Sequence, residues 1–546
     1  MALDNIAVID CETQPFRYGE VPEPFVWGFY DGTEYVYFWG EDCSEDIAHY
    51  LSDKKIVVYA HNGGKFDFHF LIPWINEGKI TYSNGRILKA WIGDCEIRDS
   101  YAIIPVPLSA YKKDDFDYNK NKKENREKYK KDILKYLKSD CVNLYEMVTG
   151  FVSEFGNKLT IASASLEQIK LYMGGKSFNR LSKGADDYFR QFYYGGRCEV
   201  FDSGEIDGEY IMMDINSAYP YAMTKKHPSP YSTDFIKVGD LPDDIDCYFA
   251  EIEAISHGAL PHRCDDGSIR FPISDKKMTF KATGHEIRAG IETGTLEVIR
   301  VIQCFRPRSV TDFSPFINEF YERKKASKKG TLEYIFNKLI QNSGYGKFAI
   351  DPCSFKDYRI VWGDRPSGTD VEYSWPEFGV HLVSKESTYG NYLNVAISAS
   401  ITGFVRAYIH RHLVKCEDVV YCDTDSIACK KFYGEIGSDL GQWDCDGVFD
   451  KLYIGGKKMY AFHKKGHIEF HGYENMTDER DVREYISKHW KIASKGGVLT
   501  PREIISIAND GEILHLRDAP SFSLTNGVRF IHRNIKNTAR IETNEH

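Results

Sequence analysis

The stretch Tyr421-Cys422-Asp423-Thr424-Asp425-Ser426 places two carboxylates two positions apart, between the apolar pairs Val419-Val420 and Ile427-Ala428. Short apolar segments on both sides of a polar centre are typical of a β-hairpin, whose tip would then carry Asp423 and Asp425. Two carboxylates this close together repel each other unless a cation lies beside them. Oxygen ligands at this density suit Mg²⁺ or Mn²⁺. The alternative is an exposed acidic turn, and the rest of the chain decides between the two.

The length and composition indicate a folded protein of several domains. The 546 residues are too many for one compact core and predict roughly three or four domains. The hydrophobic share of 42% excludes a disordered chain. The first apolar segment ends at Asp10, and no apolar run approaches the ~20 residues that span a bilayer, so we expect a cytoplasmic protein without signal peptide or membrane segment. The thirteen cysteines form no CxxC pair, which favours reduced thiols.

The net charge of −10 argues against a nucleic-acid partner, but the distribution of charge matters more than its sum. Each basic cluster alone is typical of a solvated helix face. Together they indicate local tracks that bind phosphates. The clusters lie at residues 112–113, 120–138, 323–329, 457–458 and 464–465.

Apolar periodicity predicts an α/β chain. We expect strands at residues 6–10, 26–30, 35–39, 56–60 and 211–214, and helices over 124–149 and within 315–343. Residues 227–310 are punctuated by Pro, Gly and Asp and predict an irregular α+β insertion. Residues 351–392 are rich in Gly, Pro, Ser and aromatic residues, which predicts a hairpin-rich segment.

A second group of carboxylates lies near the N-terminus. Asp10 and Glu12 share one face of a predicted strand, because strand side chains alternate with period two. Asp67 follows a later strand, and Tyr136 and Asp140 share one face of the predicted helix. Four carboxylates and a tyrosine match the needs of two-metal phosphodiester hydrolysis, in which the ions activate water and stabilise the leaving oxygen. For each pair alone, a structural salt bridge is the alternative.

The ordered set D-x-E, N-x₃-F-D and Y-x₃-D resembles the three exonuclease motifs of family B DNA polymerases, although its middle motif is one residue longer than N-x₂-F-D. The resemblance implies metal ligands, a residue that orients water, and contacts to a single-stranded 3′ end. The metal ligands would be Asp10, Glu12, Asp67 and Asp140. Tyr136 would orient the water, and Asn62 and Phe66 would contact the single-stranded 3′ end. Lys113, followed two residues later by Asp115-Phe116, resembles the lysine that assists the exonuclease in the protein-primed branch.

The segment Asp214-Ile215-Asn216-Ser217-Ala218-Tyr219-Pro220 resembles the family's D-x₂-S-L-Y-P motif, with Ala218 in place of Leu. The resemblance implies that Asp214 and Asp423 hold two catalytic Mg²⁺ ions and that Asp425 assists. Ser217 and Tyr219 would then belong to the nucleotide site. The tyrosine would lie under the incoming sugar, where a ribose 2′-OH would clash.

The segment from Lys338 to Gly346 resembles the family's K-x₃-N-S-x-Y-G motif. On a helix, Lys338, Asn342 and Tyr345 line one face. The resemblance implies that the lysine binds the triphosphate and that the tyrosine packs on the nascent base pair. A second phosphate-binding residue is expected earlier in the chain, and we favour Lys325. Its competitors are Arg323, Lys324, Lys328 and Lys329.

Three further segments resemble family motifs that contact DNA. They follow the family's order along the chain and have the forms Y-x-G-G, T-x₂-G/A-R and K-x-Y. The implied DNA contacts are Tyr193, Gly195 and Gly196 in the Y-x-G-G motif, Thr402 and Arg406 in the T-x₂-G/A-R motif, and Lys458 and Tyr460 in the K-x-Y motif.

The resemblance implies an α/β (α+β multidomain) chain, with a ribonuclease H-like exonuclease domain joined to a right-hand polymerase. We expect the exonuclease at 1–160, the start of the palm with the Y-x-G-G loop at 161–226, palm and fingers at 306–350, palm at 393–469, and the thumb and C-terminal segment at 470–546. Long stretches between motifs leave room for two insertions. The first insertion, residues 227–305, is a candidate to bind a terminal protein; the second insertion, residues 351–392, is a candidate for processivity and strand displacement.

The size and spacing resemble the protein-primed polymerases of small linear-genome phages, plasmids and adenoviruses. The resemblance implies a processive, strand-displacing DNA polymerase with proofreading 3′–5′ exonuclease that copies linear viral or plasmid DNA. Its partners would be primer-template DNA, deoxynucleoside triphosphates and a terminal protein, with Mg²⁺, or Mn²⁺ in its place, as cofactor. We expect a monomer in the cytoplasm of the host cell. The alternatives are a conventionally primed phage polymerase of family B and a non-catalytic DNA-binding protein on the same scaffold.

Overall fold

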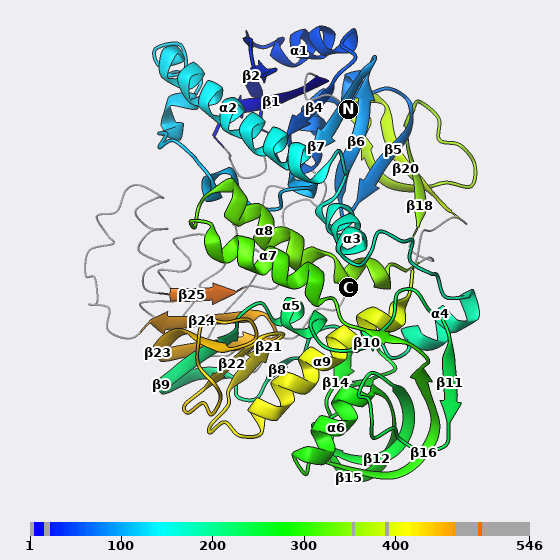
Figure 1. Cartoon of the computed structure of the whole chain (residues 1–546). Helices are drawn as coiled ribbons and strands as arrows, with labels where there is room; N and C mark the ends of the chain where they lie inside the picture. Colours follow the sequence, from blue (N-terminus) through cyan, green and yellow to red (C-terminus); the bar gives the residue numbers. More distant parts are fainter. Residues whose placement is uncertain (1–4, 16–21, 352–354, 388–392, 465–489, 494–546) are drawn as a thin grey trace. The chain divides into compact units, whose positions relative to one another are not determined.

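The computed structural model describes residues 5–15, 22–351, 355–387, 393–464 and 490–493. The described chain divides into two compact units, whose helices and strands are labelled in Figure 1. Of the described residues, the first unit comprises 5–15, 22–176, 318–351 and 355–387, and the second comprises 177–317, 393–464 and 490–493. The thumb expected over 470–546 lies outside the described residues, apart from strand β25 (Trp490–Ala493).

The first unit is built on a ten-stranded sheet. Its strands, in sheet order, are β19 (Asp370–Trp375), β20 (Val380–Glu386), β18 (Lys356–Trp362), β5 (Gly78–Ser83), β6 (Arg86–Ile92), β7 (Cys95–Asp99), β4 (Val57–Ala60), β1 (Ile6–Thr13), β2 (Pro24–Tyr30) and β3 (Tyr35–Trp39). Strand β1 lies between β4, to which it is parallel, and β2, to which it is antiparallel. It is apolar and largely buried, as a central strand covered on both faces should be. The four strands predicted within residues 6–60 are confirmed as β1 to β4.

Helices complete the first unit. They are α1 (Cys43–Ser52), α2 (Lys130–Phe155), α3 (Ile161–Tyr172), α8 (Leu332–Ser343) and α7 (Ser314–Ala326), whose residues before 318 belong to the second unit. Short 3₁₀ turns accompany them: η2 (Gly63–Lys65), η3 (Asp67–Trp74), η4 (Ser100–Ala102), η5 (Leu108–Ala110), η6 (Tyr118–Asn121), η7 (Tyr345–Ala349) and η9 (Pro376–Phe378). Helix α2 packs against β1 and β2. The predicted helix at 124–149 is real, but it is shifted toward the C-terminus. It stops where Gly156 takes a positive φ of 76°.

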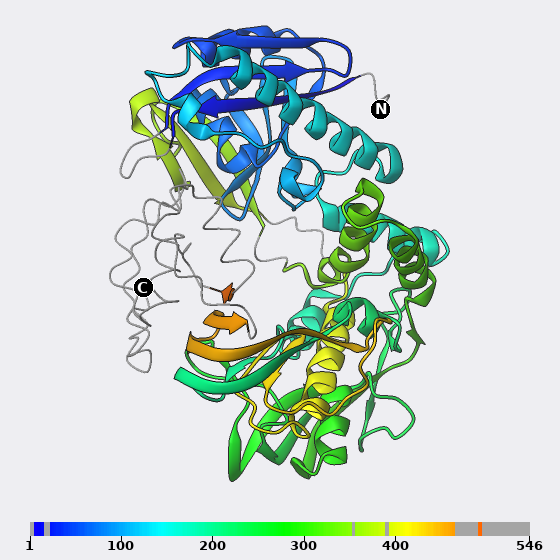
Figure 2. The ribbon, with the colours of Figure 1, turned by 90° about the vertical axis from the view of Figure 1, so that its left-hand side faces the viewer.

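The second insertion belongs to the sheet of the first unit. Strands β18 and β20 pair antiparallel, β19 pairs with β20, and β18 pairs with β5 in the register Ile360↔Gly78. Figure 2 shows these yellow-green strands beside the blue strands of the N-terminal segment. The side chains of Ile360, Trp375, Val380 and Leu382 join the core that contains Ile80. This segment therefore shares one hydrophobic core with the N-terminal domain.

The second unit contains a seven-stranded sheet and a largely buried helix. The strands, in sheet order, are β25, β24 (Met459–Lys464), β23 (Trp443–Gly456), β9 (Gly204–Ile215), β22 (Ser426–Cys429), β21 (Tyr421–Asp423) and β8 (Cys198–Val200). Helix α9 (Val395–Leu413) is apolar around most of its circumference, as a helix inside a domain should be. It packs on α4 (Lys183–Arg190), α5 (Ala218–Met223) and α6 (Gly284–Glu292).

The first insertion folds more regularly than its composition indicated. It forms a four-stranded antiparallel sheet with its own core, and α6 lies between two of the strands in the sequence. In sheet order the strands are β11 (Phe235–Val238), β16 (Leu296–Pro307), β12 (Phe249–His257) and β15 (Ile273–Thr283). Two small pairs flank them, β10 (His227–Pro228) with β17 (Val310–Thr311) and β13 (His262–Arg263) with β14 (Ile269–Arg270). Over the described residues of the whole chain, no helix has the length and apolar character needed to cross a membrane.

Candidate active sites

Three carboxylates meet in the first unit. Asp10 and Glu12 lie on the same face of β1, and Asp140 comes from α2. One carboxylate oxygen of each lies within 4.8 Å of the others. Glu12 and Asp140 are buried and Asp10 is half-buried. The structure therefore brings together three of the four carboxylates that the sequence predicted as metal ligands.

The fourth carboxylate, Asp67, is tied to the same strand. It is the first residue of η3 and is 3% exposed. The thiol of Cys11, between Asp10 and Glu12, donates a hydrogen bond to Asp67 Oδ1 at 3.2 Å. The negative charge of Asp67 also raises the pKa of Asp10, after the larger effect of burial. Asp67 thus lies in the electrostatic surroundings of the cluster.

These buried carboxylates are poor at carrying charge by themselves. Burial raises the pKa of Glu12 to about 8 and the pKa of Asp67 to about 7. Burial also raises the pKa values of Asp10 and Asp140. A divalent cation would reverse this preference, because it stabilises the ionised form of each ligand. A cluster of hard oxygen donors with this property fits Mg²⁺ or Mn²⁺.

Tyr136 and Lys113 adjoin the cluster, as predicted from the sequence. The Tyr136 ring stacks on Phe116 with a centroid distance of 4.3 Å, and its hydroxyl lies 3.0 Å from the hydroxyl of Tyr118. The Lys113 ammonium lies 6.0 Å from the centre of the Tyr136 ring. Burial raises the pKa of Asp140, and the positive charge of Lys113 opposes that rise.

Asn62 and Phe66 flank a tight turn within the middle motif. Asn62 has a left-handed backbone with φ of 62° and precedes the turn η2. Gly64 lies in that turn, where a Cβ would come within 2.0 Å of the carbonyl oxygen of Ile87. Only glycine fits this close approach. Phe66 packs edge-to-face on Phe70 with a centroid distance of 5.0 Å.

Asn121 is a residue of this site that the sequence did not reveal. Its side-chain amide donates to Glu12 Oε2 at 2.6 Å, in a buried position. The hydrogen bond lowers the pKa of Glu12, against the larger effect of burial. Asn121 lies in a lysine-rich segment without motif spacing, so only the tertiary fold brings it to the cluster.

The second group of carboxylates lies in the sheet of the second unit. The predicted hairpin is confirmed, with β21 and β22 joined by Thr424 and Asp425. Ser426 of β22 pairs with Asp423 on one side and with Asp214 of β9 on the other. Residues directly opposite one another in a sheet point to the same face. Asp214 and Asp423 therefore share one face of the sheet, two strands apart.

Lys458 contacts this group directly. Its ammonium lies 2.8 and 2.7 Å from the two carboxylate oxygens of Asp423. Tyr460 packs on Tyr421 with a centroid distance of 5.2 Å. The motif implied DNA contacts for both residues, whereas here the lysine pairs with a carboxylate of the site.

Asp444 is a further acidic residue that the motifs did not indicate. It lies on β23 directly opposite Asp214. The register of the sheet therefore places a third carboxylate on the same face as Asp214 and Asp423. No motif in the sequence marks Asp444, because its pairing with Asp214 joins residues far apart along the chain.

Ser217 and Tyr219 follow β9 without a break. Ser217 has a left-handed backbone with φ of 56° and precedes α5, whose first turn carries the half-buried Tyr219.

The motif that begins at Lys338 lies in the first unit. Lys338 and Asn342 are one turn apart on α8, and the Asn342 amide donates to the Lys338 carbonyl at 2.6 Å. Tyr345 begins η7. The helical spacing predicted for Lys338 and Asn342 is confirmed, whereas Tyr345 lies beyond the end of α8, in a separate 3₁₀ turn.

The basic residues at the end of α7 differ in their surroundings. Arg323 pairs with Glu319 at 2.7 Å and with Glu154 at 3.4 Å. The pKa of Lys324 is lowered by burial and then by the charge of Lys338. Lys324 therefore lies near the motif lysine of α8. This proximity makes Lys324 a candidate beside Lys325, which is exposed.

Thr402 and Arg406 lie inside the second unit. Both are 2% exposed. The Arg406 guanidinium pairs with Glu286 and donates to the backbone carbonyls of Tyr194 and Gly195. This burial differs from the direct DNA contact that the motif implied. The arginine instead holds the Y-x-G-G loop, which comprises residues 193–196.

Comparisons with known proteins agree with these features. A family model described as "DNA polymerase type B, organellar and viral" matches residues 106–364. The chain belongs to this family, in its protein-primed branch, and it is a DNA-directed DNA polymerase. The relative that establishes this is the DNA-directed DNA polymerase of Enterobacteria phage PRD1. It is 38% identical over 574 residues, an alignment that covers 98% of each chain.

Two solved structures show the same fold. Phi29 DNA polymerase complexed with primer-template DNA has a TM-score of 0.71 and 18% identity, covering 96% of this chain and 98% of that one. Its complex with primer-template DNA and incoming nucleotide substrates has a TM-score of 0.68 and 19% identity, covering 92% and 94%. The mixed α/β, multidomain fold of this chain is therefore that of a known polymerase over nearly its whole length.

Proposed function

We propose that the two activities of this polymerase reside in separate units of the fold. Proofreading 3′–5′ hydrolysis belongs to Asp10, Glu12, Asp67 and Asp140 of the first unit. Nucleotide addition belongs to Asp214 and Asp423 of the second, with Asp425 beside them. The observation that carries this proposal is the presence of one carboxylate cluster in each unit, each built from residues of the expected motifs.

Mg²⁺ is the proposed cofactor of both sites, and Mn²⁺ would take its place. When bound, the ions supply Lewis-acid stabilisation of phosphate oxygens. In the nuclease site Tyr136 orients the water, and Lys113 offsets part of the negative charge. In the polymerase site the strands β9 and β21 hold their carboxylates in fixed register, so that little reorganisation is needed during the reaction.

The nucleotide and DNA contacts are proposed by element. Ser217 and Tyr219 bind the incoming nucleotide at the start of α5, and Lys338, Asn342 and Tyr345 bind it from α8 and η7, with Lys324 or Lys325 as the second phosphate contact. Asn62 and Phe66 bind the frayed 3′ end in the nuclease. The loop residues Tyr193, Gly195 and Gly196, together with Lys458 and Tyr460, contact primer-template DNA.

The partners proposed are primer-template DNA, deoxynucleoside triphosphates and a terminal protein whose hydroxyl primes synthesis. The named complexes of Phi29 DNA polymerase contain primer-template DNA and nucleotide substrates, which supports the first two. The first insertion, with its separate sheet and core, is the proposed surface for the terminal protein. The second insertion is proposed to support processive, strand-displacing synthesis.

Two variants test the separation of activities. Asp423→Ala should abolish nucleotide addition and leave degradation of single-stranded 3′ ends measurable. The double change Asp10→Ala with Glu12→Ala should abolish degradation and leave primer extension intact. The measurements are primer extension and release of mononucleotides from a labelled oligonucleotide. Loss of both activities in a folded Asp423→Ala protein would contradict the assignment.

A further inference from the structure

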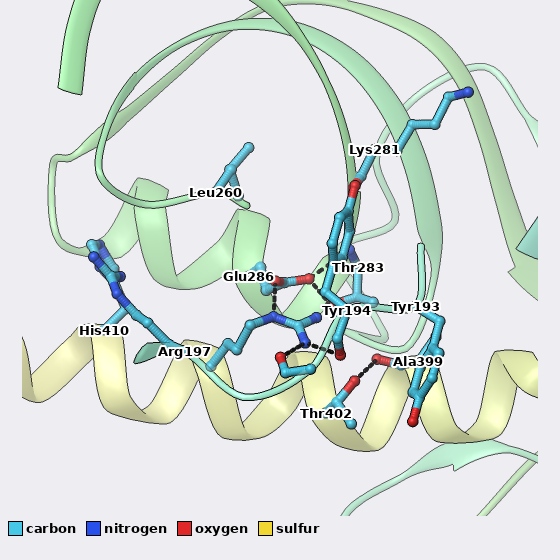
Figure 3. Close-up of polar contacts among 12 residues, drawn as sticks. Tyr193, Tyr194, Arg197, Leu260, Lys281, Thr283, Glu286, Ala399, Thr402 and His410 are labelled. Atoms are coloured by element: carbon cyan, nitrogen blue, oxygen red, sulfur yellow. Dashed lines mark hydrogen bonds and ion pairs between the residues drawn. The ribbon is translucent and has the colours of Figure 1, made fainter. Parts of the chain in front are cut away.

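A buried ion pair joins the first insertion to the palm. Arg406 of α9 donates through Nε to Glu286 Oε1 of α6 at 2.7 Å, and both side chains are 1% exposed. Figure 3 shows Glu286 beside Thr283 and the loop residues Tyr193 and Tyr194 close to it, next to the helix that carries Thr402 and His410. Replacing a buried ion pair by apolar residues is often neutral or stabilising, so stability alone does not account for this one.

Glu286 is held in one orientation by its own helix. Its second oxygen, Oε2, accepts hydrogen bonds from Thr283 N at 3.0 Å and from Thr283 Oγ1 at 2.8 Å, which closes the capping box of α6. Helices α6 and α9 approach closely at this point, because a Cβ on Gly403 would lie 2.3 Å from Thr283 Oγ1. The carboxylate therefore presents Oε1 to Arg406 from a fixed base in the first insertion.

The other side of Arg406 holds the Y-x-G-G loop. Nη1 donates to the carbonyl oxygen of Tyr194 at 2.7 Å and to that of Gly195 at 2.8 Å. The Tyr194 hydroxyl in turn donates to the carbonyl of Lys281, on β15 of the first insertion, at 3.1 Å. The backbone of the loop is thus held by Arg406, and the side chain of Tyr194 is held by the first insertion.

The same loop continues to the turn that carries Asp423 and Asp425. The backbone amide of Thr424 donates to the carbonyl of Arg197 at 2.6 Å. A Cβ on Gly196 would lie 2.6 Å from Thr424 Oγ1, so only glycine lets the loop pack against this turn. A displacement of the loop would therefore displace the residue between the two aspartates.

A second buried link runs parallel to the first. The Arg197 guanidinium donates to His410 Nδ1 at 3.1 Å, and His410 Nε2 lies 2.7 Å from Thr295 Oγ1 in the first insertion. Because Nδ1 accepts from arginine, the proton of the neutral imidazole is on Nε2 and is donated to Thr295. Two independent sets of hydrogen bonds thus connect the first insertion with the residues that flank Thr424.

We propose that Glu286 is a positioning residue for nucleotide addition: through Arg406 and the Y-x-G-G loop, the first insertion sets the position of the turn that carries Asp423 and Asp425. The proposal rests on the proposed function of that turn as part of the polymerase site. It makes the first insertion part of the machinery that aligns the polymerase carboxylates. Nucleotide addition then depends on α6, whereas hydrolysis in the first unit does not.

The test replaces the pair by apolar residues of similar size, in the full-length protein. The double variant Glu286→Leu with Arg406→Met removes both charges together, so the fold should persist. It also removes the two hydrogen bonds that Arg406 Nη1 donates to the loop. We expect kcat for nucleotide addition to fall roughly tenfold or more, the effect of losing one or two hydrogen bonds that align the site. KM for the nucleotide should change less than about threefold, because its contacts remain, and exonuclease activity should stay within about twofold.

A matched control exists on the same two helices. Arg411 of α9 pairs with Glu292 of α6 at 2.7 Å, in a more exposed position. The variant Arg411→Met with Glu292→Leu should leave kcat within about twofold of the unaltered enzyme. The conservative change Arg406→Lys keeps the charge beside Glu286 but loses the planar guanidinium. Its kcat for nucleotide addition should therefore lie between that of the double variant and that of the unaltered enzyme.

The outcomes separate the possible explanations. A folded Glu286→Leu, Arg406→Met variant that adds nucleotides at the unaltered rate would overturn the proposal. Equal losses in the control variant, or parallel loss of exonuclease activity, would also overturn it, because the effect would then be one of packing. Failure of the proposed function itself is distinguished by Asp423→Ala, which would then still add nucleotides.

Discussion

Glu12 and Asp67 hold carboxyl groups in surroundings that disfavour their charge, and this has a consequence for stability. Their pKa values rise from 4.5 and 3.8 to about 8 and about 7, chiefly through burial. A group whose pKa is raised by folding stabilises the fold below its unfolded pKa and loses that contribution as the pH rises through the folded pKa. In metal-free protein, these two groups should therefore destabilise the fold progressively between about pH 4 and pH 8.

The comparison of Glu12→Gln with the unaltered protein isolates this effect. In EDTA the two should have similar Tm at about pH 4 and below, where Glu12 is protonated in both the folded and the unfolded protein and resembles glutamine. At pH 8.5 the variant should be the more stable, because it carries no buried charge. Mg²⁺ should raise the Tm of the unaltered protein more at pH 8.5 than at pH 6, since protons compete with the ion for the carboxylates. Equal stability of the two proteins in EDTA at pH 8.5 would contradict this account.

Tyr219 is the residue proposed to exclude ribonucleotides. It lies half-buried in the first turn of α5, shortly after strand β9, which carries Asp214 next to its last residue. Tyr219→Val should relax the discrimination, because a smaller side chain removes the clash with the 2′-OH. The measurement is the ratio of kcat/KM for deoxynucleotide and ribonucleotide incorporation. A ratio equal to that of the unaltered enzyme would assign the selection to another residue.

Single residues could be predicted where chemistry follows directly from local spacing. Asp10 and Glu12 share a strand face because strands alternate, and Asp423 and Asp425 share a hairpin tip for a similar local reason. Asn121 and Asp444 could not be found in this way, because each is brought to its site by a partner far along the chain. Lys324 is one of five candidates in its basic run, and only its position near Lys338 distinguishes it. Arg406 illustrates the converse, since its motif is visible in the sequence but its burial is set by α6.

At the scale of whole elements, the second insertion supports the sheet of the first unit, which its composition does not indicate. Its strands extend the sheet of the first unit, and Trp375 packs against His69 of η3 with a centroid distance of 5.5 Å. Because η3 begins at Asp67, the insertion supports the segment that carries a nuclease carboxylate. The sequence indicated hairpins here, but strand pairing between β18 and β5 joins residues far apart and has no local signal.

Replacing residues 355–387 by a Gly-Ser linker tests this support. The change would remove Ile360, Trp375 and Leu382 from a shared core and expose Ile80. We expect a lower Tm and a loss of exonuclease activity along with the loss of long, strand-displaced products. Addition of a few nucleotides to a primed template should continue, since its proposed carboxylates lie in the second unit. Unchanged thermal stability and exonuclease activity would show that the insertion is only an appendage.

A surface variant separates support of the fold from contact with DNA. Trp362 and Phe378 are large apolar side chains of the insertion that are 40% and 44% exposed. Changing both to Ser should leave Tm and exonuclease activity close to those of the unaltered protein. Product length under single-binding conditions should shorten if this face contacts DNA, and an unchanged length would assign processivity to another part of the insertion.

At the scale of the whole molecule, the placement of the carboxylates in two units bears on how synthesis begins. A protein hydroxyl and a primer 3′-hydroxyl are equivalent nucleophiles toward the α-phosphate of a nucleotide, with pyrophosphate as the leaving group in both reactions. We therefore expect the proposed polymerase carboxylates to serve both initiation and elongation. The proposed nuclease site would hydrolyse a finished bond, so we expect neither reaction to need it.

Initiation can be assayed with a linear template, labelled deoxynucleotide and the terminal protein of the same genome, without any oligonucleotide. The expected product is a nucleotide attached covalently to the partner protein, which survives denaturing electrophoresis. Asp423→Ala should abolish this product together with primer extension. Asp10→Ala with Glu12→Ala should retain both and accumulate more of the labelled adduct, because short products are no longer degraded. Synthesis that starts only when an oligonucleotide primer is supplied would instead identify a conventionally primed enzyme and leave the first insertion without its proposed partner.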